Sequence, residues 1–555
     1  MTLVDWFILA IYLLISLVLG VFLARRNKDE DDYFVAGRKL TGWLAGASMA
    51  ATTFSIDTPL YVAGLVGTRG LAGNWEWWSF ALAHVAMTVV FAPMWRRSGV
   101  LTDAAFTELR YGGSTAAWLR GIKAFLLAVP INCIGIGYAF LALRKVAEAF
   151  GMVDGHQIFG IFTDSLTLLV VVGIFMLLYT ILGGLWAVVV NDFVQLLLAL
   201  FGALTLAFVV IHECGGMSQM LASLEELNRP ELLSIFPWVW TKDGFKWIES
   251  AGISAATFTA FLSLQWWSFR RSDGGGEFIQ RILATKNEQE AELAGWVFLV
   301  INYLLRSWLW IVVALSALVL IPSQQDWELS YPLLAVRYLP PVALGIVVVS
   351  LVAAFMSTVS TSLNWGSSYL THDLYKRFFR PQAGQKELIL VGQSTCVFLL
   401  GIGIITAFLS DSIGSIFRLV IAIGTGPGVV LVLRWFWWRI NATAELAAMT
   451  CGFFVGFTTS VIPVFRIEDY GLKLIFTTIL TAIVWLIALV LTPPESDEVL
   501  EKFVRLVKPP GPGWRHLRKR FGVKPVDSFG DLIVRFLLST GMLFGLLCSS
   551  GSFLL

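Results

Sequence analysis

The sequence predicts an all-α membrane protein with about 14 transmembrane helices. Hydrophobic residues make up 57% of the 555 residues, charged residues only 14%, and the mean hydropathy is +0.76. Soluble domains have about 45–50% apolar and about 25% charged residues, so this composition excludes an ordinary soluble domain. Apolar runs long enough to cross the hydrocarbon layer recur along the whole chain. Their centres lie near residues 14, 54, 86, 133, 169, 198, 260, 308, 355, 398, 424, 454, 483 and 542.

The first apolar run, residues 5–26, is expected to stay in the protein as a span. It is longer than a signal-peptide core and lacks a small-residue cleavage pattern. Basic residues follow the first, third, seventh, ninth and eleventh spans, and the positive-inside rule makes those loops cytoplasmic and both termini external. The residues are Arg25, Arg26, Lys28, Arg38, Lys39, Arg96, Arg97, Arg110, Arg281, Lys286, Lys376, Arg377, Arg380, Arg434 and Arg439.

The basic loop at 507–525 falls on the same predicted inner side. Lys and Arg beside a span usually serve topology and contact lipid headgroups, so we expect membrane lipid and no nucleic acid as a partner. A regulatory or nucleic-acid patch is the alternative for this loop. The sequence leaves the oligomeric state open.

The second span, residues 42–67, is expected to be interrupted. It is poor in Leu and Ile from Ala50 to Pro59, and Asp57 falls near mid-membrane depth. Proline and the Thr52–Thr53 pair favour local unwinding, and the released carbonyl groups then need partners, which ions can supply.

The seventh span is expected to be interrupted as well, because it runs into the triple glycine 274–276, which favours an end to the helix. Two irregular segments five spans apart are typical of two inverted five-helix repeats with the solute and ion between them. Glycine-rich ends of ordinary spans are the alternative.

The ninth span carries small and hydroxyl side chains along one face. Ala354, Ser357, Thr358 and Thr361 follow the spacing i, i+3, i+4, i+7, and Ser360 lies beside them. Hydroxyl and carbonyl oxygens suit a weakly bound sodium ion, whereas zinc or copper needs imidazole or thiolate ligands. The alternative role is close helix packing through small residues and interhelical hydrogen bonds.

Four motifs occur in order: DDYFVAGRKLTGW at 31–43, YTILGGLWAVVVNDFVQ at 179–195, EFIQRILATKNEQEA at 277–291 and MSTVSTSLNWGSSYLTHDLYKRF at 356–378. On these motifs the chain resembles the sodium/solute symporter family, whose members carry sugars, proline and sialic acid. The resemblance runs from about residue 30 to 380. It implies a LeuT-like fold of inverted five-helix repeats with discontinuous helices.

The resemblance also implies a division of the chain. Residues 1–39 would form an extra N-terminal transmembrane helix with an inner loop, and residues 213–244 an outer loop between the repeats. The two repeats would span 40–212 and 245–440. Accessory transmembrane helices with a basic inner loop would occupy 441–555.

Position by position, the family's main sodium site maps onto Ala51, Phe54, Ala354, Ser357 and Thr358. Three of these would contribute backbone carbonyls and two would contribute hydroxyls. About five neutral oxygens can replace the hydration of sodium without trapping the ion.

A second sodium site, present in some family members, maps onto Asp192, Ser360 and Thr361. An aspartate within a span is costly unless it faces protein or water, so a functional partner is the first interpretation of Asp192. A helix-end cap or an interhelical hydrogen bond is the alternative.

The solute site is predicted from polar and aromatic residues near the interrupted spans. In the family's bacterial sugar carrier, the stretch matching NWEWWS contributes two polar groups to the sugar. Carboxylates and amides suit the hydroxyls of a sugar or polyol, with a tryptophan as a platform. The candidates are Asp57, Thr58, Glu76, Ser79, Gln265 and Trp266.

Two alternatives limit this prediction. Glu76 could lie at the outer interface, where a charge is cheap, and Arg270 and Arg271 could contact an anionic solute instead of anchoring the inner end of their span. The stretch RRSDGGG at 270–276, which follows Gln265 by a few residues, departs from the family pattern.

We therefore expect secondary active uptake of a small organic solute by sodium symport and alternating access. A sugar or polyol is the first candidate, and an amino acid or carboxylate is the alternative. An enzyme is disfavoured because no catalytic or metal-binding spacing and no phosphate loop occurs in the sequence. A transporter-like sensor would need a signalling domain, and one more span completes the chain at Leu555.

Overall fold

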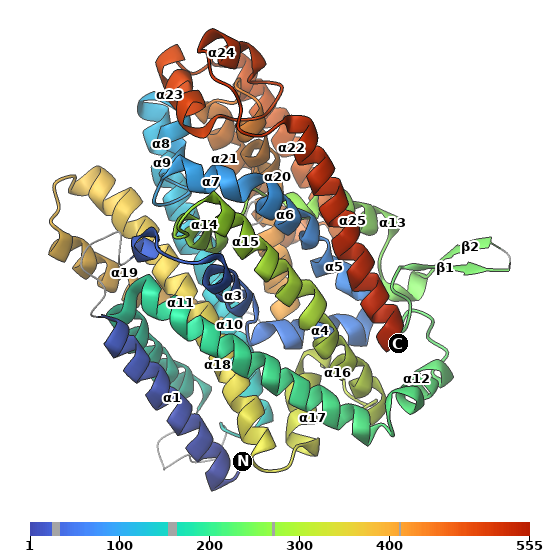
Figure 1. Cartoon of the computed structure of the whole chain (residues 1–555). Helices are drawn as coiled ribbons and strands as arrows, with labels where there is room; N and C mark the ends of the chain where they lie inside the picture. The colour runs from blue at the N-terminus through green and yellow to red at the C-terminus, as the bar shows by residue number, and fades with distance from the viewer. Residues whose placement is uncertain (25–33, 154–163, 243, 269–271, 410–411) are drawn as a thin grey trace.

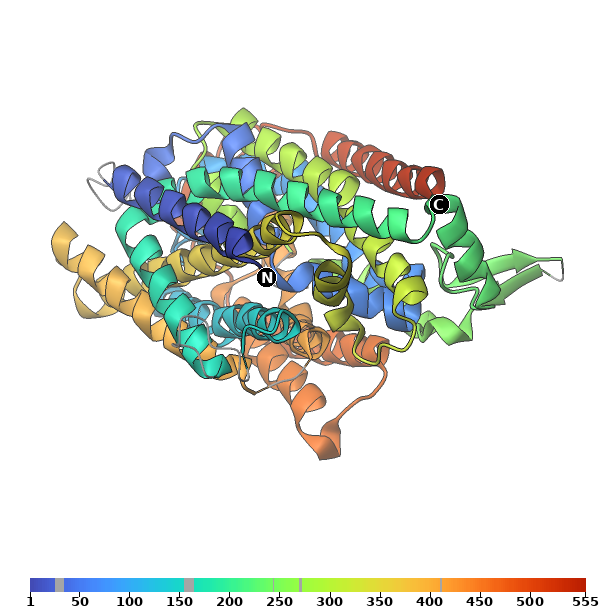
Figure 2. The ribbon, with the colours of Figure 1, turned by 90° about the horizontal axis from the view of Figure 1, so that it is seen from below.

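The computed structural model describes residues 1–24, 34–153, 164–242, 244–268, 272–409 and 412–555. Most of these residues are helical. The one strand pair among them is the antiparallel hairpin of β1 (Trp238–Thr241) and β2 (Gly244–Trp247). Figures 1 and 2 show this hairpin projecting from a bundle of long helices.

Eleven helical stretches of the described residues are long and apolar enough to cross a membrane. They are Leu3–Gly20, Leu71–Ser98, Gly113–Ala149, Gly184–Glu213, Glu288–Leu320, Ala343–Phe379, Gln385–Ala407, Ile413–Phe436, Ala442–Val461, Tyr470–Leu491 and Phe529–Leu554. The predicted count of fourteen is therefore not reproduced. Shorter helices occupy the predicted spans near 54, 169 and 260.

The second predicted span is divided into two helices. α3 (Gly42–Thr53) ends where the amide of Phe54 donates to the carbonyls of Ala50 and Ala51, at 2.9 and 3.0 Å. α4 (Asp57–Arg69) begins three residues later. The predicted interruption is confirmed, and it leaves a helix end deep in the protein whose carbonyls have no next turn to bond.

The seventh predicted span is also divided. α13 (Ala255–Ser263) and α14 (Gly276–Leu283) are separate, and between them Gly274 and Gly275 have φ angles of 135° and 68°. The predicted interruption is confirmed, but α13 ends at Ser263, and the glycines lead into α14 with angles that only glycine adopts at little cost. Arg270 and Arg271 lie outside the described residues.

The remaining helices pack around these interrupted elements (Figure 1). They are α1 (Leu3–Ala24), α5 (Trp75–Trp78), α6 (Phe80–Ala86), α7 (Ala92–Ser98), α8 (Phe106–Arg110), α9 (Gly113–Leu126), α10 (Asn132–Ala149), α11 (Ser165–Glu213, kinked at Gly184), α12 (Met217–Glu226), α15 (Glu288–Leu299), α16 (Ser307–Leu320), α17 (Ser330–Tyr338), α18 (Ala343–Ser368), α19 (Gln385–Ala407), α20 (Ile413–Phe436), α21 (Ala442–Val461), α22 (Tyr470–Leu491), α23 (Asp497–Val507), α24 (Arg515–Arg520) and α25 (Phe529–Leu554).

Glycines bring two pairs of helices into close contact. A Cβ atom on Gly46 of α3 would lie 2.5 Å from the carbonyl oxygen of Ala294 on α15. A Cβ atom on Gly202 of α11 would lie 2.3 Å from Oγ of Ser350 on α18. Such contacts let helices approach closely within a membrane. α3 therefore packs tightly on α15, and α11 packs tightly on α18.

Both chain termini lie in the lower half of Figure 1, and α23 and α24 lie at the top. The predicted basic loop at 507–525 thus lies at the opposite end of the bundle from the termini.

Candidate functional site

A cavity of about 100 Å³ lies beside the interruption between α3 and α4. Its lining combines hydroxyl groups, charges of both signs and aromatic rings. The lining residues are Thr52, Thr53, Ser55, Asp57, Thr58, Tyr61, Trp77, Phe80, His84, Tyr138, Glu277, Asn302, Tyr303, Arg306, Thr358, Ser362, Ile413 and Phe417. We call this space the central cavity. A small polar molecule with an apolar face would match such walls.

The hydroxyl-bearing face of α18 meets the end of α3 at this cavity. Oγ1 of Thr358 donates to the carbonyl oxygen of Thr52 at 2.9 Å and to that of Ala354 at 3.2 Å. Ala51 and Phe54 are buried at the same helix end. The structure thus brings together the two elements that the sequence predicts for the main sodium site. The uncharged hydroxyl and carbonyl oxygens of these two elements are the kind of ligand that suits an alkali ion.

Asp192 on α11 is fully buried beside this contact. Its carboxylate accepts from the hydroxyls of Ser48 at 2.5 Å and Ser357 at 2.6 Å, and the Arg281 guanidinium lies 3.6 Å away. These are interhelical hydrogen bonds to α3 and α18, as the alternative interpretation of Asp192 expected, and a role of Asp192 in binding sodium stays a prediction.

Arg281 lies among the residues predicted for a second sodium site. Its guanidinium donates to the Thr361 hydroxyl at 2.6 Å and so lies between Thr361 and Asp192. The Ser360 hydroxyl donates instead to the Ser357 carbonyl of its own helix, at 3.2 Å. The cation beside Asp192 in this structure is therefore an arginine.

Arg306 is a residue of the cavity that sequence reasoning missed. It is 2% exposed, and its guanidinium donates to the Ala50 carbonyl and to the Thr53 hydroxyl, both at 2.8 Å. The carbonyl end of a helix is its negative end, so a fixed cation is favourable there. The available signal was a single arginine within the apolar stretch Glu288–Leu320.

Glu76 is fully buried, so its charge is compensated by protein groups and not by solvent. Oε1 accepts from the Tyr61 hydroxyl at 2.8 Å and from Nε of Arg418 at 2.7 Å. Oε2 accepts from Arg69 at 2.7 Å and from the second nitrogen of Arg418 at 3.1 Å. We call these four residues the Glu76 cluster. Neither arginine was singled out from the sequence.

The predicted solute residues divide into two groups. Asp57 and Thr58 line the central cavity. Gln265 instead donates to the Glu76 carbonyl and, at 3.1 Å, to the Ser79 hydroxyl. Trp266 packs against Trp267 and Phe536, with ring centroids 5.5 and 6.5 Å apart. None of the described residues that line the central cavity is one of the other four predicted solute residues, which are Glu76, Ser79, Gln265 and Trp266.

Comparison with known proteins identifies the family. The family model of the sodium:solute symporter family matches residues 33–452. The chain belongs to the sodium:solute symporter family. The symporter is thus a membrane transport protein, and its relatives are cotransporters and not enzymes.

Two similar proteins show how varied the solutes of relatives are. The sodium/glucose cotransporter of Vibrio parahaemolyticus is 26% identical over 471 residues, covering 80% of the symporter and 82% of that protein. The osmoregulated proline transporter OpuE of Bacillus subtilis is 26% identical over 464 residues, covering 80% and 86%.

A solved structure of a sodium-coupled sialic acid symporter, in a substrate-bound outward-open state, has the same fold. It superposes with a TM-score of 0.70 at 20% identity, covering 89% of the symporter and 99% of that chain. The likeness establishes the architecture, and the solute of this symporter is a separate question.

Two larger spaces lie beyond the Glu76 cluster. Their volumes are about 540 and 700 Å³, and both are lined by Arg69 and Arg418. Tyr61 lines the smaller of the two as well as the central cavity. We call them the vestibules. The Glu76 cluster therefore stands between the central cavity and both vestibules.

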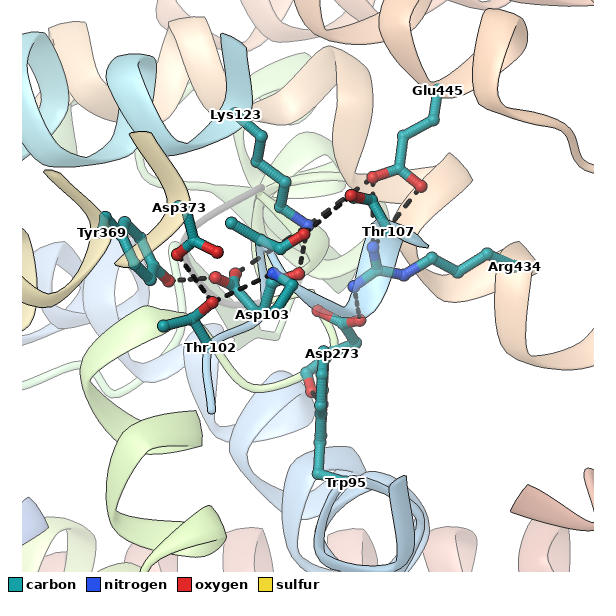
Figure 3. A network of polar contacts seen from close by, with 12 residues as sticks. Trp95, Thr102, Asp103, Thr107, Lys123, Asp273, Tyr369, Asp373, Arg434 and Glu445 are labelled. Atoms are coloured by element: carbon teal, nitrogen blue, oxygen red, sulfur yellow. Dashed lines mark hydrogen bonds and ion pairs between the residues drawn. The ribbon is translucent and has the colours of Figure 1, made fainter. Parts of the chain in front are cut away.

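A second polar cluster lies near the other end of α20 (Figure 3). Arg434 pairs with Asp273 at 2.6 Å and with Glu445 at 3.1 Å, and the Lys123 ammonium lies 3.6 Å from Glu445. We call the residues around these pairs the Arg434 network. Its other members in Figure 3 are Trp95, Thr102, Asp103, Thr107, Tyr369 and Asp373.

Asp103 lies in the loop between α7 and α8 and extends the Arg434 network. Its carboxylate accepts from the Tyr369 hydroxyl, and Lys123 lies 3.9 Å away. Burial raises the pKa of the Asp103 carboxyl above its usual range, although Lys123 opposes the shift. Keeping the Asp103 carboxyl ionised in the folded protein therefore costs free energy.

Proposed function

We propose that this symporter couples the uptake of a small organic solute, a sugar or polyol, to the inward movement of sodium by alternating access. One observation carries the proposal. The Thr358 hydroxyl of α18 contacts the Thr52 carbonyl at the end of the interrupted α3, at the wall of the central cavity. Ion ligands from two separate elements would thus meet beside the solute, as coupling between them requires.

The proposed main sodium site consists of the carbonyls of Ala51, Phe54 and Ala354 and the hydroxyls of Ser357 and Thr358. Both hydroxyls donate their hydrogen to protein acceptors. A hydroxyl oxygen that donates still has lone pairs, so each can face a cation at the same time. Charge neutrality of the five ligands would keep sodium exchangeable.

The proposed second sodium site, at Asp192, Ser360 and Thr361, is the weaker of the two. Arg281 already places a positive charge 3.6 Å from the Asp192 carboxylate. Like charges repel strongly at buried sites, so a sodium ion there would require Arg281 to move.

The proposed solute binds in the central cavity. Asp57, Thr58 and Asn302 supply hydrogen-bonding groups for hydroxyls, and Trp77 and Phe417 supply aromatic faces. Among the other predicted residues, Glu76 adjoins the cavity through its bond to Tyr61. The glucose cotransporter among the relatives supports this choice.

An amino acid is the second candidate solute. Arg306 lines the same cavity as Asp57 and Glu277, so charges of both signs face one space. A carboxylate and an ammonium group on one solute would match such an arrangement. The proline transporter among the relatives supports this alternative.

The energetics allow uptake without ATP. One sodium ion moving through 100 mV releases about 2.3 kcal/mol. Since about 1.4 kcal/mol corresponds to a factor of ten, a single ion could sustain roughly fortyfold accumulation of a neutral solute.

The proposed topology places the basic loops, including 507–525, in the cytoplasm and both termini outside. Basic clustering on one side supports this orientation. We also propose that residues 40–212 and 245–440 form the two inverted repeats, each beginning with an interrupted span.

The test is solute uptake by proteoliposomes under an inward sodium gradient, with sugars, polyols and amino acids compared. We expect the double substitution of Ser357→Ala and Thr358→Ala to abolish sodium-stimulated uptake, because two ion ligands are lost. Expression is expected to stay normal. The matched control replaces Thr205 and Ser394 by Ala, since both hydroxyls are exposed and bond only their own helix. Normal uptake without sodium would contradict the proposal.

A further inference from the structure

The Glu76 cluster is the boundary between the central cavity and the vestibules. Rings close the cavity beside it: Phe417 lies 5.0 Å from Tyr61 and 6.1 Å from Phe80, measured between centroids. Arg418 follows Phe417 directly on α20. One turn of α20 thus supplies both an aromatic wall of the cavity and a charge of the cluster.

The two arginines that bind Glu76 are attached to the protein differently. Arg69 and Tyr61 belong to α4, and Arg69 lies seven residues before Glu76 in the chain. Arg418 belongs to α20 and lies 342 residues away. The side chains of Arg69 and Arg418 are 20% and 31% exposed, and both line the two vestibules.

A buried carboxylate is costly without a cation beside it. If Arg418 withdrew, Glu76 would keep Arg69 at 2.7 Å and the Tyr61 hydroxyl at 2.8 Å. The carboxylate would therefore remain paired. Only the two contacts from α20 would be lost.

α20 contains a place where it can bend. Pro427 lies inside the helix, nine residues after Arg418, and is flanked by Gly424, Gly426 and Gly428. Proline lacks the amide that would bond the carbonyl of Ile423, and kinks occur at such positions. The turn that carries Phe417 and Arg418 lies on the vestibule side of this position.

We propose that Arg418 is the mobile positioning residue of a gate between the vestibules and the central cavity, and that Arg69 is the resident partner of Glu76. Bending of α20 at Pro427 withdraws Phe417 from Tyr61 and Arg418 from Glu76 together. The inference rests on the proposed alternating-access function and adds to it the residues that close one side.

The experiment measures access to the central cavity with a thiol reporter. Ser362→Cys places a thiol on α18 in the cavity lining, outside the Glu76 cluster. Cys451 and Cys548, which are half-buried, are replaced by Ala, and the other three cysteines are buried. A small, charged, membrane-impermeant thiol reagent is then applied to cells from outside.

We expect R418Q to raise the labelling rate of the reporter by at least about tenfold, because the closed state loses its two contacts from α20. R466Q is the matched control: Arg466 lines the same vestibule but pairs with Glu468, and its side chain is 56% exposed. It is expected to leave the rate unchanged.

An unchanged rate in R418Q would overturn the proposal, as would an equal rise in R466Q. If R418Q does not fold, R418K replaces it. Lysine keeps the charge but cannot make the two-point contact, so a smaller rise is expected, and no rise would overturn the proposal. Labelling needs no transport, whereas failure of the proposed function would appear as absent sodium-driven uptake by the parent protein.

Discussion

The Glu76 cluster and the Arg434 network lie near opposite ends of α20 and hold their charges in opposite ways. Sixteen residues of helix separate Arg418 from Arg434, which corresponds to about 24 Å. In the Glu76 cluster one buried carboxylate has two arginines. In the Arg434 network one buried arginine serves two carboxylates, Asp273 and Glu445. Glu76 can lose Arg418 and keep Arg69, whereas loss of Arg434 takes from Asp273 its one ion pair among the described residues and leaves Glu445 with Lys123 alone.

The largest expected effect is that of R434Q. Arg434 and Glu445 are fully buried and Asp273 nearly so; without the guanidinium both carboxylates lose their closest cation. Breaking a buried pair in this way costs about 3–5 kcal/mol. We expect a large fall in the melting temperature of the purified protein, measured by the loss of the monodisperse peak after heating. A fall no greater than that of R466Q would show that the two buried carboxylates do not depend on Arg434.

The next effect is the coupling between the two arginines of the Glu76 cluster. Either single substitution, R69Q or R418Q, leaves Glu76 with one cation, but the double substitution leaves none. The double variant should therefore lose more stability than the sum of the single variants, by about 1–3 kcal/mol. A double-mutant cycle on thermal stability measures this, and additive losses would mean that Arg69 does not act as the resident partner.

A smaller effect is expected for R418Q alone. Its guanidinium is partly exposed and Arg69 remains on Glu76, so the loss should be about 1 kcal/mol or less. The comparison with R434Q in one thermal experiment is direct, since both arginines lie on α20. Losses of equal size would show that the Glu76 cluster depends on Arg418 as much as the Arg434 network depends on Arg434.

The smallest effect concerns Asp103 at the edge of the Arg434 network. Its raised pKa means that the ionised carboxyl costs stability at neutral pH, and that this cost disappears as pH falls through the raised pKa towards 3.8. D103N should match or exceed the parent in thermal stability at pH 7, by less than about 1 kcal/mol, and the difference should shrink in acid. A parent more stable than D103N at pH 7 would mean that the ionised Asp103 carboxyl stabilises the fold.

Local features of the sequence predicted the elements that build the site. Pro59 and the glycines at 274–276 marked the two interruptions because their effects depend on the backbone of a few neighbouring residues. The hydroxyl face of α18 followed from helix periodicity. Two of the three predicted spans missing from the count, those near 54 and 260, are the interrupted ones, which contain no long continuous helix, and the third, near 169, is the shorter helix Ser165–Leu178.

The partners within the site could not be predicted in the same way. The motif around Glu76 indicated a useful carboxylate, but its contact with Arg418 joins residues 342 positions apart. Likewise, the sequence placed Trp266 near the solute, whereas the ring packs against Phe536 of the last helix. Such contacts depend on how whole helices pack, which neither spacing nor composition contains.

The glycine contacts of α3 and α11 have a mechanical consequence. The backbones of α3 and α15, and of α11 and α18, approach closely at Gly46 and Gly202, so we expect the two helices of each pair to move together. The contact from Thr358 to Thr52 crosses from one such pair to the other. The hydrogen bond from Ser48 to Asp192 crosses between the same two pairs. An alkali ion bound at the proposed main site would add a further link between them, and its departure would weaken their attachment without any helix having to unfold.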